Sequence, residues 1–210
     1  MVAVIDYGVG NLFSVEKAVA AQGVEVTVTN DPEVIRAADK IVLPGVGAFG
    51  DCMKNLTESG LIPTIMERIE AGVPLLGICV GLQILFEGSE ESPGVPGLGI
   101  IKGQVRLIEA AKPENRKNGL KVPHMGWNMV TAKEPRQPVD LFKGLGDEPF
   151  FYFVHSYHGV PEDRSVITAT ADYGGEVTAA VVVGNVQATQ FHPEKSGDVG
   201  QKILHNFIYG

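Results

Sequence analysis

Residues 74–86 read PLLGICVGLQILF and place a cysteine between two glycines. An apolar run leads into G-I-C-V-G (residues 77–81), and a second apolar run follows. The first run predicts a buried strand over residues 73–78, and the second predicts a helix over residues 82–87. A strand that turns into a helix through G-x-C-x-G is the thiol form of the nucleophile elbow. We therefore expect Cys79 to lie on a sharp chain reversal.

The first half of the chain alternates between two kinds of segment. Short apolar, β-branched runs predict strands over residues 2–6, 24–29 and 40–43. Amphipathic patterns predict helices over residues 11–22, 31–39, 49–57 and 61–71. Strands that alternate with helices in this way form a parallel sheet covered by helices on both faces.

The second half carries strand-like runs without helices between them, before a closing amphipathic helix over residues 197–209. These runs span residues 100–108, 127–131, 150–154, 165–171, 176–183 and 186–191. Gly184-Asn185 between the last two predicts a hairpin turn. The fold class is therefore α/β, with a mostly parallel central sheet flanked by helices and additional antiparallel strands in the second half. We expect a single domain over residues 1–210.

The composition narrows the function classes. The chain of 210 residues is 44% hydrophobic and has a formal net charge of -8. It lacks the basic patch that nucleic-acid binding requires, and it lacks the apolar run of about 18 residues that a membrane span requires. Two cysteines and no signal-like N-terminus indicate a cytoplasmic protein. No His or Cys cluster has metal-ligand spacing, so we expect neither a metal nor a cofactor.

The elbow gives Cys79 the surroundings of a nucleophile. The free N–H groups at the start of the following helix favour a thiolate, and the Val80 N–H can donate to an oxyanion. The alternative is a buried cysteine in an ordinary turn between strand and helix. A nucleophilic thiol also needs a base.

His192 is the candidate base, because it follows the last strand in VQATQFHPEKSG (residues 186–197). Glu194 lies two residues on, and in extended backbone positions i and i+2 share a face. A histidine oriented by a carboxylate is a general base. A surface His–Glu pair is the alternative reading, but together with the elbow the pair favours a Cys79–His192–Glu194 triad.

A second loop is rich in glycine. LPGVGAFGD (residues 43–51) follows a buried strand, so it opens at the same carboxyl edge of the sheet as the elbow. Backbone N–H groups of Val46 and Gly47 can complete an oxyanion hole there. Gly45 predicts a flexible loop, which a partner could shift from an inactive to an active orientation. This hypothesis predicts weak basal activity that rises when the partner binds.

Three motifs in this order, PGVGAFGD, GICVGLQ and QFHPEKS, resemble the class I (triad) glutamine amidotransferase family over nearly the whole chain. The resemblance implies that Cys79 attacks the side-chain amide of glutamine, that His192 transfers the proton and that Glu194 orients His192. It implies an oxyanion hole at Val46, Gly47 and Val80. It also implies a substrate pocket that contains Gln83, Glu91, Ser156 and Tyr157.

Three further stretches, DYGVGN, HMGWN and YFVHSY, resemble the branch of this family that supplies ammonia for histidine biosynthesis. That resemblance implies a heterodimer with a (β/α)₈-barrel cyclase. Asn11, Trp127 and His155 lie in these stretches, and Lys195 lies in QFHPEKS. All four are candidates for the partner-facing rim. For Trp127 a core position is the alternative.

Three rival functions remain open at this point. The chain could serve another ammonia-using synthase, such as one that makes pyridoxal phosphate, although HMGWN and PGVGAFGD speak against it. It could be a stand-alone cysteine hydrolase of γ-glutamyl peptides. It could also be a regulatory subunit without activity, which intact Cys79, His192 and Glu194 argue against.

Overall fold

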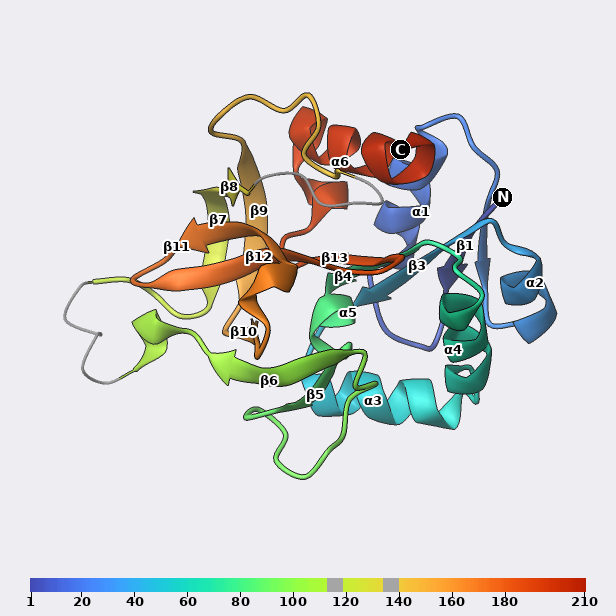
Figure 1. Ribbon diagram of the computed structural model, residues 1–210, viewed down its shortest axis with the longest axis horizontal. Helices are drawn as coiled ribbons and strands as arrows, with labels where there is room; N and C mark the ends of the chain where they lie inside the picture. Colours follow the sequence, from blue (N-terminus) through green and yellow to red (C-terminus); the bar gives the residue numbers. More distant parts are fainter. Residues whose placement is uncertain (113–118, 134–139) are drawn as a thin grey trace.

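A computed structural model describes residues 1–112, 119–133 and 140–210 (Figure 1). Within them an eight-stranded sheet has the strand order β2-β1-β3-β4-β13-β12-β11-β8. Its strands are β1 (Val2–Ile5), β2 (Val26–Thr29), β3 (Lys40–Gly45), β4 (Leu75–Cys79), β8 (Thr131–Ala132), β11 (Ile167–Asp172), β12 (Glu176–Val183) and β13 (Val186–Thr189).

The parallel half of the sheet runs from β2 to β13. Strands β1 and β4 are buried along their whole length, as continuous apolar runs predict for a sheet covered on both faces. β4 lies between β3 and β13 and runs parallel to both, so the C-terminal strand of the sheet lies beside the elbow strand. The register pairs Gly45 with Cys79 and Thr189 with Ile78. The loops that follow β3, β4 and β13 therefore open together at one edge of the sheet.

The other half of the sheet is antiparallel, which confirms the additional antiparallel strands predicted for the second half of the chain. β12 and β13 form a hairpin, and β11 and β8 extend it as antiparallel neighbours. Gly184 in the hairpin turn has φ +55°, a conformation that glycine adopts at little cost.

Helices cover both faces of the central sheet (Figure 1). α1 (Leu12–Ala20) and α6 (Gly197–Tyr209) lie over one face, and α3 (Phe49–Glu58) and α4 (Ile62–Glu70) lie over the other. α2 (Pro32–Ala37) has the expected Asp31 N-cap, which accepts from the Glu33 N–H, and Pro32 in its first turn. None of the helices in the described residues has both the length and the apolar character needed to cross a membrane.

Two smaller sheets lie beside the central one. β10 (Tyr157–Pro161), β6 (Ile101–Leu107) and β5 (Phe86–Ser89) form the first. β7 (His124–Met129) and β9 (Phe150–His155) form a two-stranded antiparallel ribbon. The ribbon has a buried inner face and an outer face with exposed apolar side chains.

Two sequence predictions fail near the elbow. The predicted helix over residues 82–87 is wrong, because α5 spans only Val80–Gln83 and the chain then enters β5. The run is buried on every side, so its apolar pattern cannot distinguish a buried strand from a helix, and Phe86 pairs with Ile101 of β6. Strand β10 was not predicted either, since YHGVP (residues 157–161) contains both glycine and proline.

Candidate active site

Cys79 has the strained backbone expected of an elbow nucleophile. Its φ is 56°, the only positive φ among the described residues other than glycine. A Cβ at Gly81 would lie 2.0 Å from the Leu43 carbonyl oxygen, and one at Gly77 would lie 2.8 Å from the Gly81 carbonyl oxygen. Both flanking glycines are therefore required by close backbone contacts, as the G-x-C-x-G pattern predicted.

His192 reaches the elbow because β13 pairs in parallel with β4. Its backbone N–H donates to the Tyr152 carbonyl (2.9 Å), and its carbonyl accepts from Ser196 Oγ (2.6 Å). His192 Nδ1 lies 2.7 Å from Glu194 Oε1, as expected for a base and its orienting group. The predicted extended backbone is wrong, because Pro193–Lys195 form a 3₁₀ turn, η4, which itself brings the carboxylate back to the ring.

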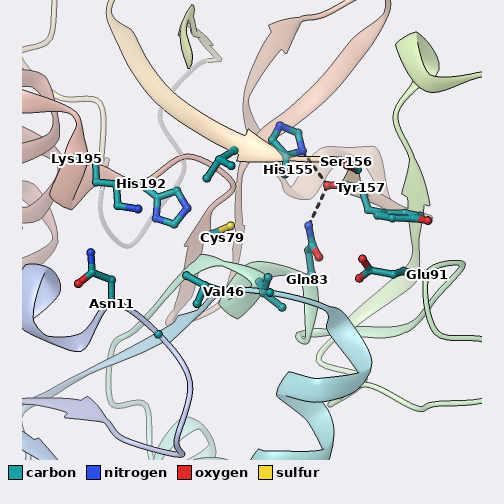
Figure 2. A pocket seen from close by; sticks show the side chains of 14 residues that line it. Asn11, Val46, Cys79, Gln83, Glu91, His155, Ser156, Tyr157, His192 and Lys195 are labelled. Carbon is teal, nitrogen blue, oxygen red and sulfur yellow. Dashed lines mark hydrogen bonds between the residues drawn. The ribbon is translucent and has the colours of Figure 1, made fainter. Parts of the chain in front are cut away.

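The second ring nitrogen of His192 faces the thiol. Nε2 is buried and has no hydrogen-bond partner among the described residues, and Figure 2 shows the ring directed toward Cys79. Burial alone would lower the pKa of His192, but the Cys79 side chain and the Glu194 carboxylate raise it to about 9. The site therefore favours a protonated imidazole at neutral pH.

The loop after β3 lies against the elbow. A Cβ at Gly45 would lie 2.7 Å from the Gly81 N and 3.0 Å from the Tyr7 hydroxyl, so this glycine serves close packing. The expectation that Gly45 makes the loop flexible is not supported, because Tyr7 Oη also donates to the Pro44 carbonyl (2.6 Å). Val46 and Gly47 follow, and Gly47 has φ +89°.

Cys52, the second cysteine, is a buried packing residue on α3. Its Sγ donates to the Val46 carbonyl (3.3 Å), so it contacts the loop without facing the cavity. Burial raises the pKa of the Cys52 thiol to about 11. Cys52 is therefore a poor nucleophile.

A cavity of about 550 Å³ joins these groups (Figure 2). Its lining contains twelve of the residues expected at the site or its rim, together with Gly10 and Val154. The twelve are Asn11, Val46, Gly47, Cys79, Val80, Gln83, Glu91, His155, Ser156, Tyr157, His192 and Lys195. The remaining two expected residues, Glu194 and Trp127, lie behind His192 and on the ribbon, respectively.

The expected substrate residues line one side of this cavity. Gln83 Nε2 donates to the Tyr157 carbonyl (2.9 Å) and to Gln190 Oε1 (3.1 Å). Glu91 lies near the start of α3, where its Oε2 accepts from the Phe49 N–H (2.8 Å). A carboxylate held in this way is a suitable acceptor for an ammonium group.

The expected rim residues divide into two groups. Asn11 and Lys195 line the cavity, and Trp127 is 55% exposed, which excludes the alternative core position. Asn11 also accepts from the Ser14 N–H as the N-cap of α1. The expectation that His155 lies on the rim is wrong, because its side chain is only 6% exposed: it follows the inward alternation of β9.

Two residues that support the site were not expected from the sequence. Gln190 Nε2 lies 3.8 Å from Cys79 Sγ. Ser196 Oγ accepts from the Tyr152 N–H (3.0 Å) and donates to the His192 carbonyl. Gln190 lies two positions before His192, a spacing that could have identified it. Nothing in the sequence indicates the role of Ser196. The part of the chain that the structure describes contains no group of three or more His, Cys, Asp or Glu side chains able to hold a metal ion.

A thiol on an elbow, faced by an imidazole that a carboxylate orients, is the arrangement of a thiol-dependent hydrolase on an α/β sheet. Comparison with known proteins defines the family. Residues 3–210 match the family described as glutamine amidotransferase class-I, and the chain belongs to that family.

Individual relatives agree with this assignment. The chain is 52% identical over 207 residues to the imidazole glycerol phosphate synthase subunit HisH of Syntrophotalea carbinolica, covering 99% of this chain and 98% of that one. It is 50% identical to the subunit of the same name from Moorella thermoacetica, covering 98% of this chain and 93% of the relative. The solved structure of PurLQS from Thermotoga maritima has the same fold, with a TM-score of 0.75, 20% identity and coverage of 99% and 96% of the two chains.

Proposed function

We propose that this chain is the glutamine-hydrolysing subunit of an imidazole glycerol phosphate synthase and delivers ammonia to a separate cyclase. The observation that carries the proposal is the contact between His192 Nδ1 and Glu194 Oε1 (2.7 Å) behind a thiol on a strained elbow. Relatives of that name match the chain over nearly their full length, which favours this pathway over pyridoxal phosphate synthesis and over a stand-alone hydrolase. The single domain spans residues 1–210, and a reactive thiol suits the reducing cytoplasm.

The reaction has two halves. The Cys79 thiolate attacks the side-chain amide carbon of glutamine, and the C–N bond breaks as His192 gives its proton to the departing nitrogen, which leaves as ammonia. Water then attacks the γ-glutamyl thioester with His192 as base, the C–S bond breaks, and glutamate leaves. Glu194 holds the imidazole in the tautomer that both proton transfers need.

Backbone groups stabilise the tetrahedral intermediates. Val80 begins α5, so its N–H has no partner within the helix and can donate to the oxyanion. Val46 and Gly47 supply the second donor from the opposite loop. Across the cavity, Glu91 holds the α-ammonium group of glutamine, while Gln83 and the Ser156–Tyr157 backbone hold the rest of the substrate.

The outer face of the ribbon is the docking surface for a (β/α)₈-barrel cyclase. The register stacks three apolar pairs on this face: Met125 with Val154, Trp127 with Tyr152, and Met129 with Phe150. Met125 is 62% exposed and Phe150 is 50% exposed, a concentration of apolar surface typical of an interface. Val154 also lines the cavity, so a partner seated here lies at the cavity mouth, next to Asn11 and Lys195.

Reconstitution tests this function. The chain, a barrel cyclase and the cyclase's nucleotide substrate are mixed with glutamine as the sole nitrogen source, and imidazole product and glutamate are measured. We expect both products to form in equal amounts, and glutamate release by the chain alone to be far slower. With ammonium salts the cyclase should need no second chain. Equal glutamate release with and without the cyclase would refute the coupling.

Replacing Trp127 by Ala is expected to weaken the complex with the cyclase. A buried interface tryptophan contributes about 2 kcal/mol or more, which corresponds to a Kd about 30-fold higher, measured by titration calorimetry. Tyr209→Ala is the matched control, because Tyr209 has the same 55% exposure but lies at the end of α6. An equal effect of both changes on the Kd would show that the ribbon is not part of the interface with the cyclase.

A further inference from the structure

Two buried histidines face each other across the ribbon, outside the triad. The register pairs His124 with His155, and His124 Nδ1 lies 2.9 Å from His155 Nε2. The His124 side chain is 2% exposed and is stacked between Phe153 (4.6 Å between ring centroids) and Tyr173 (3.9 Å). This pair lies directly beneath the docking surface, since Met125 and Val154 next to it point outward.

Fixed backbone groups at both ends determine where the protons lie. His155 Nδ1 lies 2.8 Å from the Tyr157 carbonyl, which can only accept, so Nδ1 carries the proton. At the other end Asn128 Oδ1 accepts from the Met129 N–H (2.8 Å), which directs the Asn128 amide nitrogen to His124 Nε2 (3.2 Å). His124 Nε2 therefore accepts.

One assignment of protons gives every hydrogen bond in this series a donor and an acceptor. Asn128 donates to His124, His124 donates to His155 through Nδ1, and His155 donates to the Tyr157 carbonyl. This order requires both imidazoles to be neutral. Burial lowers the pKa of His124 to about 4 and that of His155 to about 3, in agreement with two neutral rings at pH 7.

The chain of bonds ends on the substrate side of the cavity. The Tyr157 carbonyl that accepts from His155 also accepts from Gln83 Nε2 (2.9 Å), and Figure 2 shows both bonds meeting at this oxygen. Gln83 Nε2 is shared with Gln190 Oε1 (3.1 Å), so both hydrogens of the Gln83 amide are directed into the wall. The amide oxygen of Gln83 then lies on the side of Glu91 (Figure 2).

We propose that His124 and His155 are positioning residues for glutamine binding: they hold the Tyr157 carbonyl, and through it the Gln83 amide, with its acceptor oxygen presented to the substrate. This role rests on the proposed function, because it concerns the same cavity. Without the His155 donor, the Tyr157 carbonyl loses one of the two hydrogen bonds that fix it, and the Gln83 amide bonded to it is held less firmly. Glutamine binding should then suffer more than the thiol chemistry, since neither ring contacts Cys79.

The test compares three variants in complex with the cyclase. His155→Leu removes both ring nitrogens and is expected to raise the KM for glutamine about 10-fold, the equivalent of one hydrogen bond, with kcat within about 3-fold. His155→Asn keeps an amide N–H near the position of Nδ1 and should recover most of the loss. His158→Leu is the control, because His158 is also buried (8% exposed) but alternates to the opposite side of β10 from Tyr157 and bonds the Thr178 N–H.

Each outcome is decisive. An unchanged KM in His155→Leu, or an equal rise in His158→Leu, overturns the positioning role. If His155→Leu does not fold, ¹⁵N NMR of the wild-type rings decides: both must carry the proton on Nδ1 at pH 7, and a proton on Nε2 of either ring overturns the proposal. Wild-type protein that releases no glutamate with the cyclase refutes the proposed function instead, so the two failures are distinguishable.

Discussion

Replacing Cys79 by Ala is expected to lower glutamate release by the complex with the cyclase by about 10⁵-fold or more. The substitution removes the only thiol that faces the cavity among the described residues, and no other side chain there can form the thioester. Losses of this size are typical when a covalent nucleophile is removed. The measurement is steady-state glutamate release at saturating glutamine.

Two controls make this result specific. Cys52→Ala should retain activity within about 10-fold, because the Cys52 thiol lies behind the loop and only bonds the Val46 carbonyl. The Cys79→Ala complex should still convert ammonium salts to imidazole product at the wild-type rate, because the cyclase is intact. Glutamate release that survives in Cys79→Ala would contradict the triad.

Replacing Gly81 by Ala is expected to destabilise the fold strongly. The new Cβ would lie 2.0 Å from the Leu43 carbonyl oxygen, and backbone in the centre of the sheet cannot move away as a side-chain tip can. Overpacking of this kind costs about 3 kcal/mol or more, which lowers the midpoint of urea unfolding. Protein that remains folded should also lose at least about 100-fold in activity, because the elbow that aims Cys79 must shift.

Gly146→Ala is the matched control for this change. Gly146 is exposed, and nothing lies within 4 Å of the position its Cβ would take. The free energy of unfolding should change by less than about 0.5 kcal/mol. If Gly81→Ala is as stable and active as Gly146→Ala, the close contact between the elbow and Leu43 does not exist.

The sequence indicates the proposed triad because the elbow and the His192–Glu194 pair depend on local chain geometry. Gly77 and Gly81 are needed wherever a strand reverses into a helix at a nucleophile, and Glu194 follows His192 closely enough to reach its ring by any compact turn. The parallel order of strands then brings both loops to one sheet edge. The glycine requirement and the His192–Glu194 spacing are local, and the meeting of the loops follows from the parallel strand order, although it takes the pairing of β13 with β4 to realise it.

The features that sequence analysis missed depend on distant contacts. Strand β5 replaces the predicted helix because Phe86 pairs with a strand about fifteen residues further along the chain. His155 points inward because β9 pairs with β7 in a register that no local pattern reveals. The bonds from His124 to Gln83 involve three separate segments, so only the folded chain shows them.

Covalent trapping with a substrate analogue identifies the nucleophile of the site. A glutamine analogue with an electrophilic carbon in place of the side-chain amide is incubated with the complex, and the site of modification is mapped by peptide mass spectrometry. We expect one adduct per chain, on Cys79, with labelling blocked by excess glutamine and strongly slowed in His192→Ala. Label on Cys52, or an unlabelled Cys79 in a preparation that releases glutamate, would contradict it.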